Sequence, residues 1–179
     1  MNGERKNIHR GKLVSSFVLG SKATYDFLHN NPLVEMHPTE YTNDPFIISQ
    51  HDNMVAINSC LQIDLTGQVV SDNTGSTIIS GFGGQVDFIR GAARSKGGRP
   101  IIAMPATAKG GKISRIVSEH PAGYGITTTR ADVHWIATEY GIVDLWGMHR
   151  KKRAQALIDL AHPSFREQLQ EDAVRLGFL

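Results

Sequence analysis

Residues 77–104 read TIISGFGGQVDFIRGAARSKGGRPIIAM, and the pattern changes several times along this stretch. The β-branched residues at its start, 77–79, indicate a short strand. A glycine-rich turn over residues 81–84 comes next, and a helix is predicted after it, with apolar residues on one face: Val86, Ile89 and Ala93. Residues 100–104 are apolar and predict a buried strand. Such alternation of strand, helix and strand is typical of an α/β fold.

The same alternation continues upstream. Residues 54–65 carry apolar side chains at alternate positions, which predicts a long strand. A turn at Thr66 and Gly67 allows residues 68–70 to return as the second arm of a hairpin. Before it we expect two strands and one helix: a buried strand over residues 13–19, a helix over residues 21–28 and a strand over residues 34–36.

Downstream we expect strands over residues 113–117 and 132–138, and helices over residues 150–160 and 165–176. Ser164 and Glu167 have the spacing of a capping box for the last helix. The whole pattern predicts an α/β fold with an open mixed sheet flanked by helices. We interpret residues 1–10 as a tail or a cut linker and residues 11–179 as one domain.

Composition excludes several classes of protein. The net charge of +2 over 179 residues is too small to indicate a nucleic-acid surface. Cys60 is the single cysteine, so an internal disulfide is excluded. No apolar run has the length of about 18 residues that suggests a membrane span, and the first residues have no apolar signal segment. The eight histidines form no metal-binding pair, so we expect no metal.

The glycine cluster Gly81, Gly83 and Gly84 allows two interpretations. Its backbone N–H groups, at the start of a helix, could hold an anion or a developing oxyanion. It could equally be a tight turn between a strand and a helix. It does not match the dinucleotide-binding fingerprint, because the last glycine of that motif would fall on Val86.

Three further positions carry candidate chemistry. Lys109 and Lys112 flank two glycines and suit phosphate groups, although spacing alone slightly favours a solvated basic turn. Asn43 could donate its amide to an oxyanion, or it could cap a helix. Asp44 can cap the helix that Pro45 begins, which would leave the Asn43 side chain free. We interpret Cys60 as a buried, inert thiol and residues 150–153 as a solvated basic helix face.

Several ordered strings resemble the C-terminal part of the acetyl-CoA hydrolase/transferase family, in its branch of 4-hydroxybutyrate and butyryl CoA-transferases. They are YTNDP at residues 41–45, NMVAINS at 53–59, GFGGQVDF at 81–88, TAKGG at 107–111, TTTRADVH at 127–134, TEYG at 138–141 and AHP at 161–163. The resemblance implies a CoA-transferase-like fold and coenzyme A as substrate. It extends from about residue 3 to the end of the chain.

The resemblance also implies a reaction in which a glutamate carboxylate attacks an acyl-CoA and a glutamyl-CoA thioester then forms. Asn43, Gly83 and Gly84 resemble the residues that hold the thioester oxyanion in the family. Leu61, Ser80, Gly84 and Lys109 fall at positions where relatives contact CoA.

The family's nucleophilic glutamate lies in a segment that this chain does not include. The nearby glutamates are Glu4, Glu35, Glu40 and Glu139, and none of them lies in the sequence context of the family's nucleophile. We interpret Glu139 as structural or as a residue that supports the site from behind. The resemblance implies acyl-CoA and a short-chain carboxylate (4-hydroxybutyrate, butyrate or acetate) as substrates, and a missing N-terminal half as partner. It allows a homodimer, and it implies no nucleic acid and no membrane. We expect the isolated chain to be inactive.

Two alternatives stay open from the sequence: an acetyl-CoA hydrolase, and a non-catalytic module that binds CoA or a nucleotide. The expected location is the cytoplasm, or the mitochondrion if a longer form carries a transit peptide.

Overall fold

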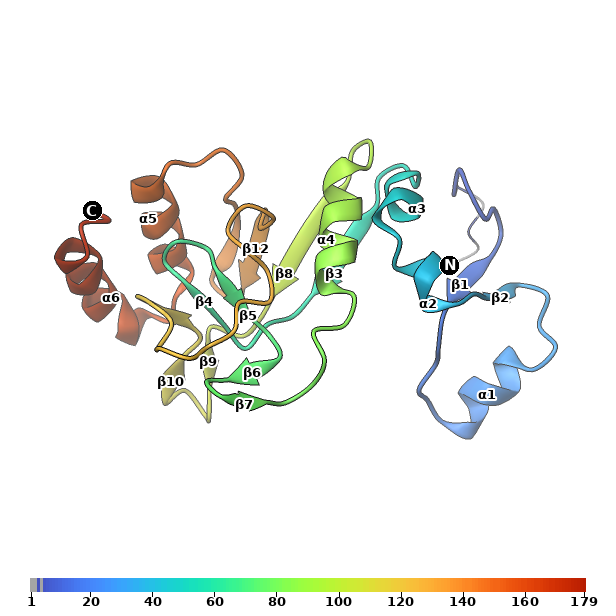
Figure 1. Ribbon diagram of the computed structural model, residues 1–179, viewed down its shortest axis with the longest axis horizontal. Coiled ribbons are helices and arrows are strands. Elements are labelled where there is room, and N and C mark those ends of the chain that lie inside the picture. Colours follow the sequence, from blue (N-terminus) through green and yellow to red (C-terminus); the bar gives the residue numbers. More distant parts are fainter. Residues whose placement is uncertain (1–2, 4) are drawn as a thin grey trace.

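A four-stranded mixed sheet lies at the centre of the computed structural model, which describes residue 3 and residues 5–179 (Figure 1). Its strands, in spatial order, are β13 (Gly141–Asp144), β12 (Trp135–Thr138), β8 (Arg99–Ala103) and β3 (Val55–Asn58). Strands β12, β8 and β3 are parallel, and β13 pairs antiparallel with β12 at one edge. The α/β prediction with an open mixed sheet is confirmed.

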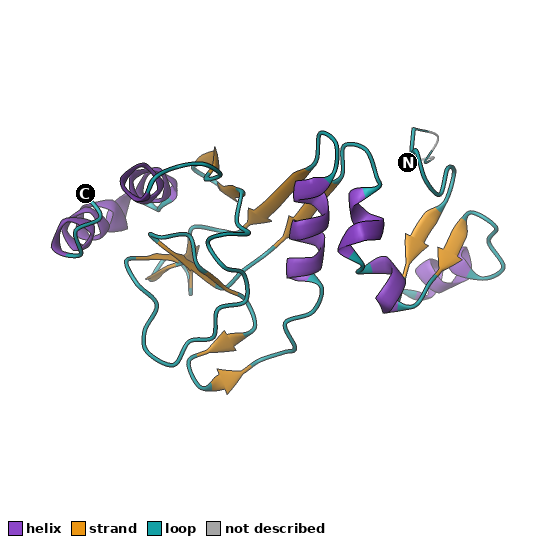
Figure 2. Cartoon of the chain, turned by 45° about the horizontal axis from the view of Figure 1, so that its top comes forward, coloured by secondary structure: helices purple, strands orange, loops and turns teal. Residues whose placement is uncertain are grey.

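Helix α4 (Gln85–Arg94) packs against strands β8 and β3, and helix α3 (Pro45–Ser49) lies beside α4 (Figure 2). Ile89 and Ala92 of α4 are fully buried. Ala93, expected on the inner face, is exposed, because the buried stripe passes through Gly91 and Ala92 instead. The helix prediction for this segment is therefore confirmed and its inner face is partly corrected.

A second sheet has three strands. It contains β11 (Ile116–Val117), β4 (Gln62–Asp64) and β5 (Val69–Val70), and β4 and β5 form the expected hairpin. Two small hairpins complete the strands: β6 (Asn73–Thr74) with β7 (Thr77–Ile78), and β9 (Thr107–Ala108) with β10 (Ile113–Ser114). Helices α5 (Arg150–Leu160) and α6 (Pro163–Arg175) close this end of the molecule. The core between these elements includes fully buried side chains: Ile63, Leu65, Ile136, Leu145 and Leu157.

The N-terminal segment lies at the opposite end from α5 and α6 (Figure 1). Strand β1 (Leu13–Ser15) pairs in parallel with β2 (Val34–Met36), and helices α1 (Lys22–Leu28) and α2 (Thr39–Thr42) accompany them. The expected buried strand over residues 13–19 is only partly right, because the strand is limited to residues 13–15 and is not fully buried. The side chains of Phe17 and Leu19, which follow β1, are 71% and 85% exposed.

Two long strand predictions break in the structure. The segment 54–65 forms β3 and then β4, and the two strands belong to different sheets. Within β3, Val55 and Ile57 are exposed while Ala56 is buried, so the alternation is right but the buried face is the other one. The segment 113–117 divides in the same way between β10 and β11.

The predicted N-terminal cap is correct for helix α3 and wrong for helix α6. The Asp44 carboxylate accepts a hydrogen bond from the backbone N–H of Phe46 at 2.8 Å, so the predicted cap of α3 is confirmed. The predicted capping box of the last helix is wrong. His162 caps α6, and its ring nitrogen accepts from the N–H of Ser164, which lies inside the first turn.

The basic run at residues 150–153 also differs from its expected role, because Arg153 is buried. Its guanidinium donates hydrogen bonds to the backbone carbonyls of Thr66, Arg130 and Leu145, at 2.9, 2.9 and 3.0 Å. Arg153 therefore connects α5 to three segments of the fold instead of facing solvent.

The contact between α3 and α4 depends on Gly91, which has no side chain. A β-carbon added there would collide with the Ile48 side chain and lie 3.2 Å from the Pro45 carbonyl oxygen. Alanine normally stabilises a helix relative to glycine by about 1 kcal/mol. At Gly91 we expect the opposite effect: Gly91→Ala should lower the free energy of unfolding by about 1–3 kcal/mol, as in other overpacked cores. Thermal unfolding measures this change.

The exposed neighbour Ala93 provides the matched control. Ala93→Gly should cost only the ordinary helix propensity of about 0.5–1 kcal/mol. A melting temperature that rises in Gly91→Ala would contradict the close packing of α3 on α4.

Candidate functional site

Asn43 and Gly84, which are distant in the sequence, meet where α3 packs on α4. Asn43 ends helix α2, and Gly84 is the residue that precedes α4. A β-carbon added at Gly84 would collide with the amide nitrogen of the Asn43 side chain, and it would lie 3.1 Å from Asn43 Cγ. Gly84 has an ordinary φ of −94°, so the close approach of Asn43, and not the backbone conformation, requires glycine here.

The orientation of the Asn43 amide follows from its neighbours. The Thr42 hydroxyl donates a hydrogen bond to Asn43 Oδ1 at 3.0 Å. Asp44 caps α3, so Asn43 is not needed for that role. Within the described part of the chain the Asn43 amide nitrogen makes no hydrogen bond, and it points toward the start of α4. The amide therefore remains available as a donor to a ligand.

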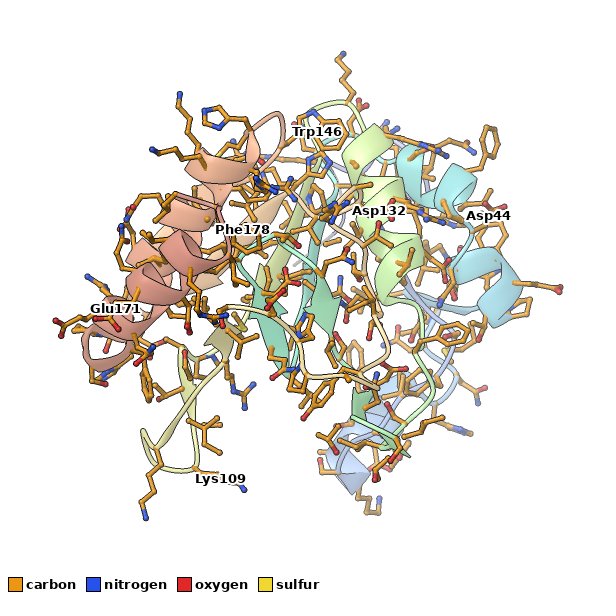
Figure 3. All side chains as sticks on the ribbon, turned by 60° about the vertical axis from the view of Figure 1, so that its left-hand side comes forward. Asp44, Lys109, Asp132, Trp146, Glu171 and Phe178 are labelled. Carbon is orange, nitrogen blue, oxygen red and sulfur yellow. The ribbon has the colours of Figure 1, made fainter. Side chains whose placement is uncertain are left out.

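An open cavity of about 660 Å³ lies at this contact. Its lining combines the glycine loop with the segment around Asn43 and two aromatic residues: Ser16, Phe17, Thr39, Glu40, Asn43, Asp44, Pro45, Gly81, Phe82, Gly83, Gly84 and Asp87. Figure 3 shows Asp44 on the segment that faces α4. The Asn43 amide and the start of helix α4 both lie at this cavity, and amide and helix-start N–H groups are donors that can stabilise an oxyanion.

Sequence reasoning identified Asn43, Gly83 and Gly84 at this cavity but missed six of its lining side chains: Ser16, Phe17, Thr39, Glu40, Phe82 and Asp87. Phe82 stands between two glycines of a loop, which is the sequence signal that could have identified it, and its side chain is 74% exposed. The other five carry no such signal, because only the fold brings their segments together.

The other three predicted CoA contacts do not line this cavity. Ser80 directly precedes the glycine loop, and its hydroxyl donates to the Gly81 carbonyl at 2.9 Å. Leu61 is half-buried, and its N–H donates to the Val70 carbonyl at 2.8 Å. Lys109 lies in the β9–β10 turn with a φ of +49°, and Figures 1 and 3 place this turn well away from α2 and α3. A ligand that contacts all of these residues must be long.

The described glutamates differ in their surroundings. Glu139 accepts a hydrogen bond from the Ala106 backbone N–H at 2.8 Å, which gives it a structural contact as expected. Glu35 binds the His9 ring at 2.7 Å, and this hydrogen bond holds the pKa of the Glu35 carboxyl below its usual value. Glu40 lies at the cavity and is exposed. Glu4 lies outside the described residues.

Cys60 is buried, and burial raises the pKa of its thiol to about 12. Its Sγ donates toward Met104 Sδ at 3.1 Å. The interpretation of Cys60 as a buried thiol is therefore confirmed, and thiols buried in apolar surroundings are of the unreactive kind.

One cluster among the described residues contains side chains of the types that bind metal ions. Ligand atoms of His9, Glu35 and His37 all lie within 4.8 Å of one another. The ammonium of Lys12 lies 3.7 Å from the same Glu35 carboxylate and both His9 nitrogens are already hydrogen-bonded, so the cluster is internally satisfied without a cation. The expectation that the protein uses no metal stays a prediction.

None of the helices in the described part of the chain is both long and apolar enough to cross a membrane.

Comparison with known proteins places the chain in a family. Residues 20–173 match the family model of the acetyl-CoA hydrolase/transferase C-terminal domain. The 4-hydroxybutyrate coenzyme A transferase of Clostridium kluyveri is 51% identical over 172 residues, which are 96% of this chain and 40% of that protein. The acetyl-CoA hydrolase of Candida albicans is 35% identical over 73% of this chain and 24% of that protein.

Solved structures agree. RipA from Yersinia pestis superimposes with a TM-score of 0.93 at 44% identity, covering 99% of this chain and 40% of that one. The 4-hydroxybutyrate CoA-transferase of Porphyromonas gingivalis gives a TM-score of 0.82 at 45% identity, covering 97% and 40%.

The chain spans about 40% of the length of RipA and of the two 4-hydroxybutyrate CoA-transferases. The family model matches most of the chain, and several relatives share 40–52% of its residues. The chain belongs to the acetyl-CoA hydrolase/transferase family, as its C-terminal domain.

Proposed function

We propose that this chain is the part of a CoA-transferase that binds CoA and stabilises the oxyanion, while the nucleophilic glutamate lies upstream in the complete enzyme. The complete enzyme moves CoA between an acyl-CoA and a short-chain carboxylate through a glutamyl-CoA thioester. The observation that carries the proposal is the contact of the Asn43 amide with Gly84 above an open cavity. Relatives named as CoA-transferases at 40–52% identity support the reaction class.

In the proposed first step a glutamate carboxylate attacks the thioester carbonyl carbon. The carbonyl oxygen becomes an oxyanion, the C–S bond then breaks, and CoA leaves as a thiolate. This leaves an acyl-glutamyl anhydride. The Asn43 N–H₂ and the Gly84 N–H would donate hydrogen bonds to the oxyanion, and such preorganised donors act most strongly on the transition state.

In the next step the CoA thiolate attacks the glutamyl carbonyl carbon, and the first carboxylate leaves. The acceptor carboxylate then attacks the glutamyl-CoA thioester, CoA thiolate leaves again, and a second anhydride forms. CoA finally attacks the acyl carbon of that anhydride, so the new acyl-CoA and the free glutamate carboxylate are produced. Every step passes through a tetrahedral oxyanion, so one oxyanion site can serve them all.

The predicted CoA contacts outside the cavity suit the shape of the substrate. CoA is an elongated molecule with an acyl thioester at one end and phosphates at the other. We assign Gly84 to the thioester end, and Leu61, Ser80 and Lys109 to the remainder. The Lys109 ammonium, on an exposed turn whose neighbours are Gly110 and Gly111, suits a phosphate group.

We further propose that residues 11–179 form the C-terminal domain and that the N-terminal part of the enzyme is its partner. The relatives are more than twice as long as this chain, which supports a division of the site between two parts. A homodimer is compatible with this arrangement. Acetyl-CoA hydrolysis is the second candidate, favoured by the Candida albicans relative; water would then take the place of the acceptor carboxylate.

The proposal is tested by comparing the 179-residue chain alone with a chimaera. In the chimaera the chain replaces the matching C-terminal part of the Clostridium kluyveri relative, to which it is 51% identical. We expect transfer from acetyl-CoA to butyrate or 4-hydroxybutyrate by the chimaera and only background turnover by the chain alone, because the covalent route needs the nucleophile. Borohydride reduction during turnover and mass spectrometry should locate an adduct on an upstream glutamate. An adduct on a glutamate of this chain would contradict the proposal, and thioester loss without any acceptor would favour the hydrolase.

In the chimaera we expect Asn43→Ala to lower kcat by about 10²–10³, the usual effect of removing one oxyanion donor. The CoA dissociation constant should change little, because the donor acts mainly on the transition state. Steady-state kinetics and calorimetric titration measure the two quantities. A large loss of CoA affinity with kcat intact would instead make Asn43 a binding residue.

Gly84→Ala and Gly81→Ala form a matched pair within one loop. A β-carbon at Gly84 displaces the Asn43 amide, whereas a β-carbon at Gly81 has nothing within 4 Å. Neither glycine has a positive φ, so backbone strain does not distinguish them. We expect Gly84→Ala to lower kcat of the chimaera by about the same 10²–10³ as Asn43→Ala, and Gly81→Ala to stay close to the parent. An equal change of kcat in both variants would contradict the proposal, because the effect would then not depend on the contact with Asn43.

A further inference from the structure

A second cavity, of about 570 Å³, lies at the start of helix α5. It is lined by three arginines and four other residues: Arg130, Arg150, Arg153, Thr66, Ala131, Met148 and Phe178. It shares no lining residue with the Asn43 cavity. Figure 3 shows Phe178, which lines it, apart from Asp44 of the first cavity. The reaction proposed above uses none of these arginines.

Arg153 is the deepest of the three, with 9% of its surface exposed. It has three hydrogen bonds, all to backbone carbonyls, and no ion pair with a carboxylate within the described part of the chain. A guanidinium carries five N–H groups, so two are left without a protein partner. Burial is the main cause that lowers the pKa of Arg153, and the positive charge of Arg130 lowers it further, only partly offset by Asp64.

The other two arginines add charge at the mouth of the cavity. The Arg130 side chain is exposed and makes no hydrogen bond or ion pair with the described residues, while its backbone carbonyl accepts from Arg153. Arg150 lies over the Phe178 ring at 5.3 Å and donates to the Gly177 carbonyl at 2.8 Å. Phe178 therefore holds Arg150 beside the cavity without neutralising it.

The start of helix α5, which contains Arg150 and Arg153, adds to the positive potential of the cavity. Its first turn consists of Arg150, Lys151, Lys152 and Arg153 and contains no acidic residue. The N-terminus of a helix carries a partial positive charge, so cations there are unfavourable and anions are favourable. The helix dipole, the basic turn and Arg130 all raise the positive potential at one place.

We infer that the cavity formed by Arg130, Arg150 and Arg153 binds an anion of the phosphate class, such as phosphate, pyrophosphate or the phosphate groups of a nucleotide. Guanidinium groups pair with phosphate oxygens through charge-assisted, often bidentate, hydrogen bonds. A bound anion would supply the countercharge that Arg153 lacks. A phosphate group offers more acceptor oxygens than a carboxylate and can engage several guanidinium groups at once.

The test is calorimetric titration of the 179-residue chain with pyrophosphate and with inorganic phosphate, together with thermal unfolding at each concentration. We expect saturable binding at one site and a rise in melting temperature with ligand concentration. Arg130→Gln should weaken pyrophosphate binding about tenfold or more, because one charge-assisted contact is lost. Arg94→Gln is the matched control: Arg94 is exposed on α4, outside the cavity, and the substitution removes the same charge.

Arg150→Gln is a second test variant, so that the result does not depend on how Arg130→Gln folds. Competition distinguishes the sources of the phosphate group. A loss of CoA affinity at saturating pyrophosphate, absent with dephospho-CoA, would assign the site to the 3′-phosphate of CoA; unchanged CoA affinity would assign it to a separate phosphate ligand. The absence of saturable binding, or an equal loss of affinity in Arg94→Gln, would overturn the inference. Because this readout is binding by the chain alone, it is independent of whether the chimaera transfers CoA.

Discussion

The close approach of the Asn43 segment to the start of α4 is the constraint on which the candidate site depends. Two missing side chains allow it. Gly91 lets Ile48 and the Pro45 carbonyl lie against the middle of α4, and Gly84 lets the Asn43 amide lie against its start. Since Asn43 directly precedes the α3 cap Asp44, the packing of α3 on α4 that stabilises the domain also sets the distance between the two donors. A shift of α3 along α4 would separate them.

The other half of the molecule depends on a different residue. Arg153 reaches from α5 to the carbonyls of Thr66, Arg130 and Leu145, which belong to three separate turns. Burying a guanidinium is costly unless its N–H groups are hydrogen-bonded, and here the backbone supplies the acceptors. The hydrogen bonds hold the turns around β4 and β5 against the C-terminal helices. The positive charge remains without a paired carboxylate, which is the origin of the basic cavity at this end.

Local sequence patterns predicted correctly those helix starts and turns that depend on an interaction between residues close together in the sequence. The Asp44 cap and Pro45 begin α3 as expected, and Thr66 and Gly67 turn the chain between β4 and β5 as expected. Predictions failed where burial depends on distant segments. Val55 and Ile57 have the alternation of a strand, but α4 covers the opposite face of β3. The sequence predicts Arg153 to be an exposed cation, because two of its three hydrogen-bond acceptors, Thr66 and Arg130, are distant from it in the sequence.

The sequence by itself determined the fold class, the family resemblance and the identity of Asn43, Gly83 and Gly84 as candidate residues. Periodicity, helix caps and turn residues depend on neighbouring amino acids, so they can be recognised in the sequence. The ordered strings that resemble the family can be recognised in the same way. Only the tertiary structure decided which candidates meet. It brought Asn43 to Gly84, and it left Lys109 on a distant turn. The physical reason is that a contact between remote segments depends on how whole helices and strands pack, and a local pattern carries no information about which face of each element its partner will cover.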